Sequence, residues 1–174
     1  MRADRARSTR LTSIPTPLRV LAVLAIVSLG TTGVALATTG TGISTTIISV
    51  GALDDLRLKS DIDGHKVDIT TKGASDLYVV DNVIAPGGNT GWHSHPGPSL
   101  ITVKSGTITE YESDDPSCTP TVHTAGQTFV DAGGDHEHIL RNEGSVPAET
   151  IAVQIVASGA PRRIDLPAPG NCPF

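Results

Sequence analysis

Two histidines separated by a single residue are the strongest chemical signal in this chain. In His93-Ser94-His95 the imidazoles stand at positions i and i+2. Residues with this spacing project from the same face of an extended strand, so both rings can bind one metal ion. Such pairs also occur by chance on protein surfaces, and the surrounding sequence must decide whether this one is a site.

A second histidine-rich segment, Asp135-His136-Glu137-His138, follows later in the chain. Alternate residues of a strand face opposite sides, so His136 and His138 share one face and Glu137 lies on the other. Two compositions of a metal site stay open: a third histidine from this segment, or the Glu137 carboxylate in its place. We expect His136 to be a solvated histidine at the rim rather than a ligand.

The residues around the first pair resemble the first sequence motif of the cupin superfamily, G-x5-H-x-H-x3,4-E-x6-G. Gly87, His93, His95 and Gly106 fall at its positions. Ser99 stands where the family has its glutamate ligand. This departure leaves the fourth protein ligand of the family unassigned in this chain.

The second histidine segment resembles the second cupin motif, G-x5-P-x-G-x2-H-x3-N, over residues 126–142. Ala132 replaces the motif's proline, and the segment is one residue longer than the motif. Counting back from Asn142 selects His138 as the motif histidine, whereas counting forward from the motif's last glycine selects Glu137. We take His138 as the third ligand.

The resemblance implies an all-β domain, the double-stranded β-helix or jelly-roll barrel of cupins, with a divalent transition metal in its mouth. Iron, manganese, nickel, copper and zinc all accept imidazole ligands. The implied ligands are His93, His95 and His138, and the implied partner is a small-molecule ligand or substrate inside the barrel. A homodimer is compatible with these features.

The pattern of the chain around these motifs agrees with an all-β fold. Segments rich in β-branched residues alternate with turn clusters that contain Gly, Pro, Asn or Asp. No segment of the domain has the apolar 3.6-residue period of an amphipathic helix. The predicted strands are His65–Thr71, Leu77–Ile84, Leu100–Lys104, Thr107–Glu112, Gln127–Asp131, Glu137–Arg141 and Glu149–Ala157.

Residues 1–37 have the features of a targeting segment. Several arginines precede an uncharged run from Val20 to Ala37, and Ala35-Leu36-Ala37 ends this run like an A-x-A cleavage site. A cleaved signal peptide and an uncleaved membrane anchor both fit this pattern. In either case the remainder faces the outside, with residues 38–46 as a linker and residues 47–174 as the domain.

Charge and cysteine content limit the partners and the compartment. Residues 38–174 carry 8 basic and 17 acidic side chains, a net charge of −9. This acidic balance argues against nucleic acid and anionic lipid headgroups as partners, so contact with a membrane is expected only through an uncleaved N-terminal segment. Cys118 and Cys172 are the only cysteines. In an exported protein we expect them to form a disulfide that holds the Pro-rich C-terminal tail.

Three kinds of function agree with these observations. The first is an exported metal-dependent enzyme, such as a small-molecule dioxygenase, isomerase or lyase, because three neutral histidines leave coordination positions open. The second is a noncatalytic extracytoplasmic protein that binds a small ligand or the metal itself. The third is a structural domain without metal. The fold does not choose among them.

Overall fold

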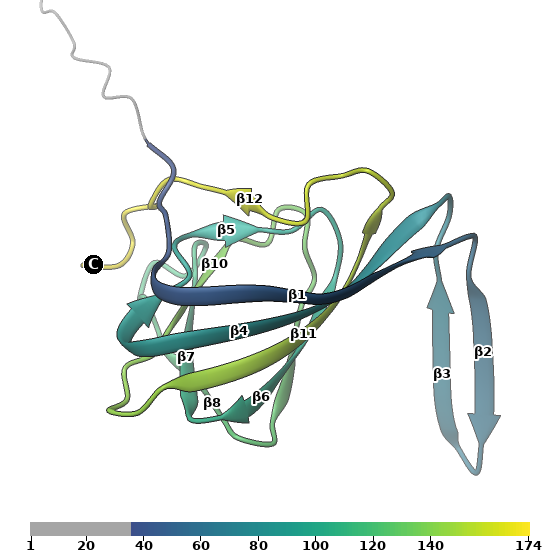
Figure 1. Cartoon of the computed structure of the whole chain (residues 1–174), viewed down its shortest axis with the longest axis horizontal. Helices are drawn as coiled ribbons and strands as arrows, with labels where there is room; N and C mark the ends of the chain where they lie inside the picture. The colour runs from purple at the N-terminus through teal and green to yellow at the C-terminus, as the bar shows by residue number, and fades with distance from the viewer. Residues whose placement is uncertain (1–35) are drawn as a thin grey trace, which may run out of the picture. The chain divides into compact units, whose positions relative to one another are not determined.

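The computed structural model describes residues 36–174 and contains twelve β-strands (Figure 1). Almost all of the predicted signal or anchor segment, residues 1–37, lies outside the described residues. Within residues 36–174 the structure contains no helix with the length and apolar character needed to span a membrane. The strands are β1 (Thr41–Leu53), β2 (Arg57–Ile62), β3 (His65–Thr70), β4 (Ser75–Asn89), β5 (His93–Ser94), β6 (Ser99–Ser105), β7 (Thr107–Glu112), β8 (Thr121–Thr124), β9 (Thr128–Asp131), β10 (His138–Arg141), β11 (Ala148–Ala157) and β12 (Ile164–Asp165).

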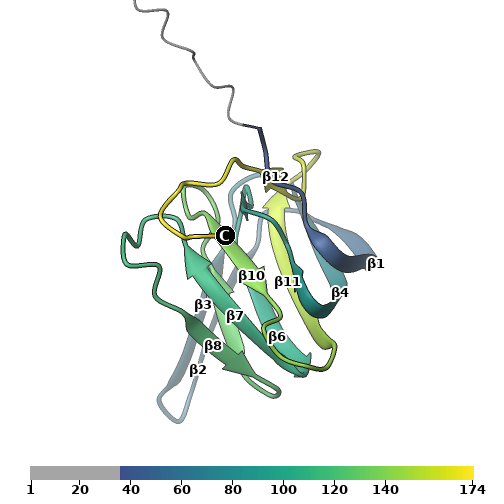
Figure 2. The same cartoon turned by 90° about the vertical axis from the view of Figure 1, so that its left-hand side faces the viewer.

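The strands form a jelly-roll barrel of two antiparallel layers, which confirms the predicted all-β fold. One layer has the order β1-β4-β11-β6-β9 and the other β12-β5-β10-β7-β8. A single pair, Arg141 of β10 with Asn89 of β4, joins the two layers along one edge. In Figure 2, β1, β4 and β11 lie on one side of the barrel and β7, β8 and β10 on the other.

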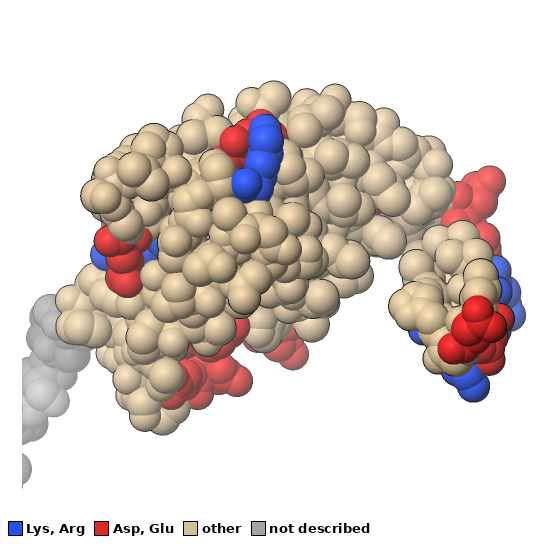
Figure 3. Space-filling view, turned by 90° about the horizontal axis from the view of Figure 1, so that it is seen from below, with Lys and Arg blue, Asp and Glu red and all other residues tan. Residues whose placement is uncertain are grey.

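Strands β2 and β3 form a separate hairpin that projects beyond the barrel (Figure 1). Asp63 and Gly64 connect the strands with φ angles of 51° and 84°, and Ile62 pairs with His65 across the turn. Positive φ at both positions is the geometry of the tight hairpin turn that Asp-Gly sequences favour. Basic and acidic side chains lie close together on this hairpin, whereas much of the barrel face in Figure 3 is uncharged.

Two expectations about the start of the domain were wrong in detail. Strand β1 begins at Thr41 and pairs with β4 as far as Leu53, so most of the predicted linker, residues 38–46, belongs to the sheet. The strand predicted to end at Ile84 continues through residues 85–89 as part of β4. Between the pairs Thr41–Asn89 and Ile43–Ile84, β1 advances two residues and β4 five. The Pro/Gly-rich residues therefore form a bulge, which can hold them inside a strand.

The barrel interior contains both apolar and polar buried residues. Along β11 the residues alternate between buried and partly exposed, as expected for a strand with one face in a core. Its buried positions include Ala148 and Ala152, which pack in the apolar core, and the polar residues Thr150 and Gln154. The buried polar residues of the barrel also include all three predicted metal ligands. The sheet therefore encloses a polar site inside the barrel.

The C-terminal tail folds back over the open end of the barrel, as the sequence predicts. Strand β12 pairs with β5, so Ile164 and Asp165 lie beside Ser94 and His93. Cys172 is bonded to Cys118, and the disulfide packs against the cluster of Trp92, Tyr111 and Ile139. The tail thus forms part of the wall around the histidines.

Candidate functional site

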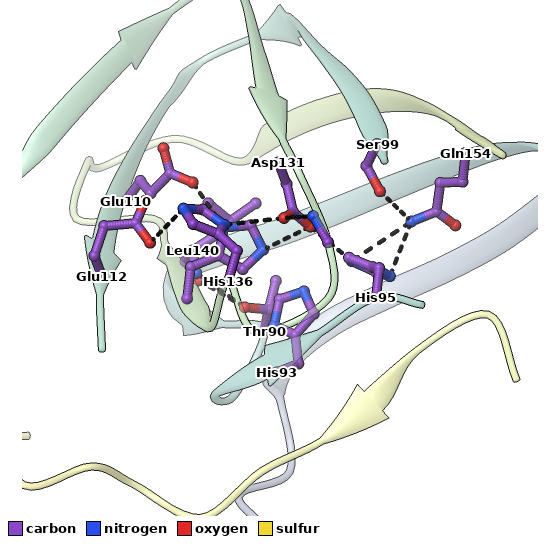
Figure 4. A network of polar contacts seen from close by, with 12 residues as sticks. Thr90, His93, His95, Ser99, Glu110, Glu112, Asp131, His136, Leu140 and Gln154 are labelled. Atoms are coloured by element: carbon purple, nitrogen blue, oxygen red, sulfur yellow. Dashed lines mark hydrogen bonds and ion pairs between the residues drawn. The ribbon is translucent and has the colours of Figure 1, made fainter. Parts of the chain in front are cut away.

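The structure brings His93, His95 and His138 together inside the barrel. His93 lies in β5 and pairs across the strands with His138, the first residue of β10, while His95 directly follows β5. One ring nitrogen of each residue lies within 4.8 Å of those of the other two. All three side chains are buried, with exposures of 3%, 4% and 0%. Figure 4 shows His93 and His95 within the polar network of the site.

Hydrogen bonds at the Nδ1 atoms fix the tautomers of all three rings. His93 Nδ1 lies 2.9 Å from the carbonyl of Gly91, and His95 Nδ1 lies 2.7 Å from the carbonyl of Arg162. His138 Nδ1 lies 2.7 Å from Glu110 Oε1. A carbonyl or carboxylate oxygen only accepts, so each Nδ1 must carry the proton and donate. Each Nε2 of a neutral ring therefore has a lone pair, which is the arrangement of metal-binding histidines. The Gln154 amide nitrogen lies 3.5 Å from Nε2 of His95, whereas Nε2 of His138 has no partner among the described residues.

The residues present fit a divalent transition metal. His138 Nε2 is fully buried and has no hydrogen-bond partner among residues 36–174. Burying a polar atom without a partner costs folding free energy. A cation bound between the three rings would give their lone pairs a partner. The structure thus holds three imidazoles that could bind one ion, while metal binding itself stays a prediction.

Burial keeps His93 and His95 neutral, the form in which an imidazole can bind a metal. It lowers the pKa of His93 well below its usual value, and the nearby His138 and Arg163 lower it further. Burial also lowers the pKa of His95 to about 4, against the opposing effect of the Arg162 carbonyl. Both rings are therefore neutral at neutral pH, with lone pairs available to an ion.

Close backbone packing at two glycines positions the loop that carries His95. A Cβ atom on Gly97 would lie 2.1 Å from the carbonyl oxygen of Ile155, and one on Gly133 would lie 2.7 Å from that of His95. Gly133 also has a φ of 71°, which favours glycine. The amide of Gly134 donates to the His95 carbonyl at 2.7 Å. The Gly133-Gly134 pair of the second motif thus fixes the backbone position of His95 in the first motif.

His136 differs from the solvated rim histidine that we expected. Its Nδ1 lies 3.0 Å from Asp131 Oδ1 and its Nε2 lies 3.0 Å from Glu112 Oε2. Burial would lower the pKa of His136, but the hydrogen bond to Asp131 and the charge of Glu112 outweigh it and raise the pKa. His136 bridges two carboxylates behind the three histidines. Glu137, the alternative ligand, is half-buried and does not belong to the histidine cluster.

Glu110 supports His138 from behind. Its Oε1 accepts from His138, and its Oε2 lies 2.9 Å from His123 Nε2. Burial alone would raise the pKa of Glu110, but the hydrogen bonds from the two histidines lower it, so the side chain is a carboxylate. His123 also stacks on the ring of Phe129.

A cavity of about 180 Å³ opens beside the three histidines. Its wall includes two arginines of the tail. Arg162 donates from Nη1 to the neutral amide oxygen of Gln154 at 3.1 Å, whereas Arg163 is ion-paired with Asp165 at 2.5 Å. Burial and the charge of Arg163 lower the pKa of Arg162. The cavity therefore joins the face formed by the three histidines to a cationic wall.

Sequence reasoning did not find the acidic and cationic residues of the site. Asp131, Glu110 and Glu112 come from β9 and β7, and no sequence pattern marks one carboxylate of a strand as buried. Arg162 comes from the Pro-rich C-terminal tail. The one available signal for it was the disulfide, because a bridge from Cys172 to Cys118 must bring the preceding residues back across the barrel.

Comparison with protein families agrees with this architecture. Residues 82–154 match the model of a cupin domain, and this range contains all three histidines. This part of the chain is a cupin domain. A comparison with curated proteins found no match.

Several solved structures are similar to parts of the chain. A structure of the DMSP lyases RdDddP and RnDddQII is 21% identical, covers 52% of this chain and 44% of that chain, and has a TM-score of 0.44. Peruvianin-I, a cysteine peptidase from Thevetia peruviana latex, is 22% identical, with coverages of 73% and 68% and a TM-score of 0.47. An oxalate oxidase is 24% identical, with coverages of 47% and 46% and a TM-score of 0.40. The chain thus spans less than half of the DMSP lyase and oxalate oxidase chains, and likenesses at this level leave its activity open.

Proposed function

We propose that this protein is an extracytoplasmic cupin enzyme that binds a divalent transition metal through His93, His95 and His138 and acts on a small anionic molecule. The observation that carries the proposal is the placement of three Nε2 atoms and the Arg162 guanidinium around one cavity. Dioxygenase, isomerase and lyase reactions are the classes we consider. Each would use coordination positions that the three histidines leave open.

The bound ion would polarise an oxygen atom of the substrate or, if redox-active, support chemistry with dioxygen. The chain's own residues would hold the reactants. His93, His95 and His138 present their lone pairs, and the acceptors at each Nδ1 keep the rings in that orientation. The layers of the barrel keep most solvent away from the buried face of the site.

Arg162 favours an anionic substrate. Its polar contact is with the neutral Gln154 amide, so no direct carboxylate contact neutralises its charge among residues 36–174. A small carboxylate could bind the metal with one oxygen and approach the guanidinium with the other. The cavity is smaller than the about 300–1,000 Å³ typical of pockets for drug-sized ligands, which favours a substrate of few atoms.

The disulfide supports the proposed location. Cys118–Cys172 is the form expected in an oxidising compartment, and both cysteines of the chain are used in it. We propose that the protein is secreted, or that it stays anchored through its N-terminal segment.

The test begins with protein recovered from outside the cell and purified without a histidine tag. Elemental analysis should find one divalent transition metal per chain, and calorimetry with a panel of small mono- and dicarboxylates should find a ligand whose binding depends on that metal. Oxygen uptake and product analysis with that ligand then report turnover. Binding of metal and carboxylate without turnover would identify a noncatalytic binding protein, and absence of metal binding would refute the proposal.

A further inference from the structure

Asp131 is a buried carboxylate whose two oxygens have different surroundings. The side chain is 0% exposed and lies at the end of β9. Oδ1 accepts from the amide of Gly133 at 2.8 Å and from His136 Nδ1 at 3.0 Å. Oδ2 has no hydrogen-bond partner among the described residues. Two donors thus hold the carboxylate by one oxygen and leave the other free.

The free oxygen faces the metal-binding atoms of the histidines. Asp131 Oδ2 lies 3.7 Å from His95 Nε2 and 3.7 Å from His138 Nε2. Figure 4 shows Asp131 between His136 and His95, with dashed lines to both. These distances are too long for hydrogen bonds, and a Nε2 atom with a lone pair has no proton to donate to the carboxylate. Acceptors therefore face acceptors, an arrangement that a cation between them would stabilise.

The spacings from Oδ2 to His95 and to His138 fit neighbouring ligands of one ion. Ligand atoms at about 2.0–2.2 Å from a tetrahedral metal are about 3.3–3.6 Å apart, close to the observed 3.7 Å. The outer atom of every candidate ligand is already held by the chain: each Nδ1 by an acceptor and Asp131 Oδ1 by two donors. This is the arrangement that orients metal ligands from behind.

Strand pairing explains why a carboxylate occurs at this place. Ser99, which occupies the position of the family's glutamate in the first motif, pairs directly with Asp131 across β6 and β9. Directly opposite residues of paired strands project from the same face, about 4.5–5.5 Å apart at Cβ. The Ser99 hydroxyl instead accepts from Gln154 at 2.9 Å. A carboxylate on the neighbouring strand can therefore reach the region that a glutamate at position 99 would serve.

We infer that Asp131 Oδ2 is the fourth protein ligand of the metal site, completing a set of three imidazoles and one carboxylate. The inference rests on the proposed metal binding. The carboxylate balances one charge of a divalent ion. Asp131 is not among the residues that line the cavity, so a substrate would reach the ion from the cavity side as a fifth ligand.

The test compares metal binding by the wild type and by Asp131→Asn. Co²⁺ is one probe, because its visible spectrum reports the number and type of its ligands. Zn²⁺ is the other, and competition with a chelator measures its affinity. Asparagine preserves the shape of the side chain but replaces Oδ2 with a weakly coordinating amide. We expect about hundredfold weaker binding of both ions and a changed Co²⁺ spectrum. Without metal, the variant should melt no lower than wild type, because the amide N–H groups can donate to the free Nε2 atoms.

Two further variants separate direct ligation from indirect effects. Ser99→Ala changes the residue paired with Asp131 and should keep the wild-type spectrum and affinity within about threefold. His136→Ala removes a donor to Oδ1 and should weaken binding less than Asp131→Asn does. If His136→Ala reproduces the full loss and the spectrum of Asp131→Asn, Asp131 acts by positioning and the assignment as a ligand is wrong.

The outcomes distinguish this inference from the proposed function. Wild-type affinity and spectrum in Asp131→Asn would overturn the fourth ligand while leaving a three-histidine site. A wild-type protein that binds neither ion would overturn both. Should Asp131→Asn fail to fold, Asp131→Glu keeps the charge and moves the oxygen by one methylene. One ion per chain with a shifted spectrum would then support ligation, and an unchanged spectrum would contradict it.

Discussion

The two sides of the histidine cluster have opposite charge. Behind the rings, Glu110 holds His138 and Asp131 approaches two Nε2 atoms, and both carboxylates come from strands of the barrel. In front, Arg162 and Arg163 line the cavity, and both come from the C-terminal tail. The acidic side suits a cation, and the basic side suits an anion that binds to this cation.

The difference in origin separates the two tasks of the site. The acidic side belongs to paired strands and is fixed by the barrel. The basic side is held by the short β12 pairing and by the disulfide at Cys172. Changes to the strands should therefore affect metal binding first, and changes to the tail should affect anion binding first.

The largest effect is expected on the metal-binding side. Alanine at His93, His95 or His138 removes one of the converging imidazoles, and each variant should bind metal at least about a thousandfold more weakly, roughly 4 kcal/mol. His136→Ala should cost much less, because that ring faces two carboxylates rather than the common point. Elemental analysis after dialysis and metal titration measure the loss.

Circular dichroism provides the control for these four variants. The barrel should persist without metal, because its apolar clusters and disulfide do not involve the ion. An essential His136 together with a dispensable His138 would contradict the placement of the extra residue in the second motif. A loss caused by Glu137→Gln alone within that segment would support the two-histidine, one-carboxylate alternative.

The three clustered histidines could be found from the sequence because their spacing is local. His93 and His95 are separated by one residue, and His138 stands four residues before Asn142. The structure explains the latter spacing: Asn142 is fully buried and donates to the carbonyls of Ile84 and Val146, which anchors the end of β10. Seven strands were also predicted, because alternation and turn residues mark them locally.

The residues that the sequence did not reveal depend on contacts between distant segments. Asp131 lies near the histidines only because β9 pairs with β6. The residues near Asp131 in the sequence do not predict the register of this pairing. Arg162 reaches the cavity only because the tail crosses the barrel. Strand β1 was interpreted in part as a linker because its Gly/Thr-rich start resembles one, although pairing with β4 stabilises it.

The disulfide prediction tests the basic side as a unit. Cys118 and Cys172 are 54 residues apart, and closing such a loop stabilises the fold by about 4 kcal/mol in the chain-entropy model. The double serine variant should melt roughly 10–15 °C lower than wild type and should not respond to reductant. Anion binding should weaken more than metal binding in this variant. Equal loss of both would show that the tail also supports the metal ligands.

Acid should destabilise the metal-free protein through the buried histidines. The pKa of His95 is about 4 in the folded protein against 6.5 as its usual value, so the unfolded chain binds the proton first as the pH falls. Stability is therefore lost between about pH 6.5 and pH 4, by about 3 kcal/mol for this residue. His93 acts in the same direction, whereas the raised pKa of His136 opposes it. Denaturant unfolding with a chelator present at pH 7, 6, 5 and 4 measures the change.

His95→Ala is the matched variant for this measurement. It should unfold with a weaker dependence on pH across the same window, because the residue with the lowered pKa has been removed. Equal stability of the wild type at pH 7 and pH 4, or an unchanged slope in His95→Ala, would contradict the role assigned to burial.

The smallest and most specific effect is expected at Arg162. Arg162→Gln removes the guanidinium that faces the cavity, while the backbone carbonyl that accepts from His95 stays in place. Binding of a small carboxylate to the metal-loaded protein should weaken about 10- to 100-fold, the range of one charge-assisted contact, and metal affinity should stay within about threefold. Arg57→Gln, on the projecting hairpin, is the matched control and should change neither. Calorimetry with metal and with carboxylate in separate titrations resolves the two effects. If Arg162→Gln weakens both equally, the two sides of the site are coupled through the Arg162–His95 contact rather than separable.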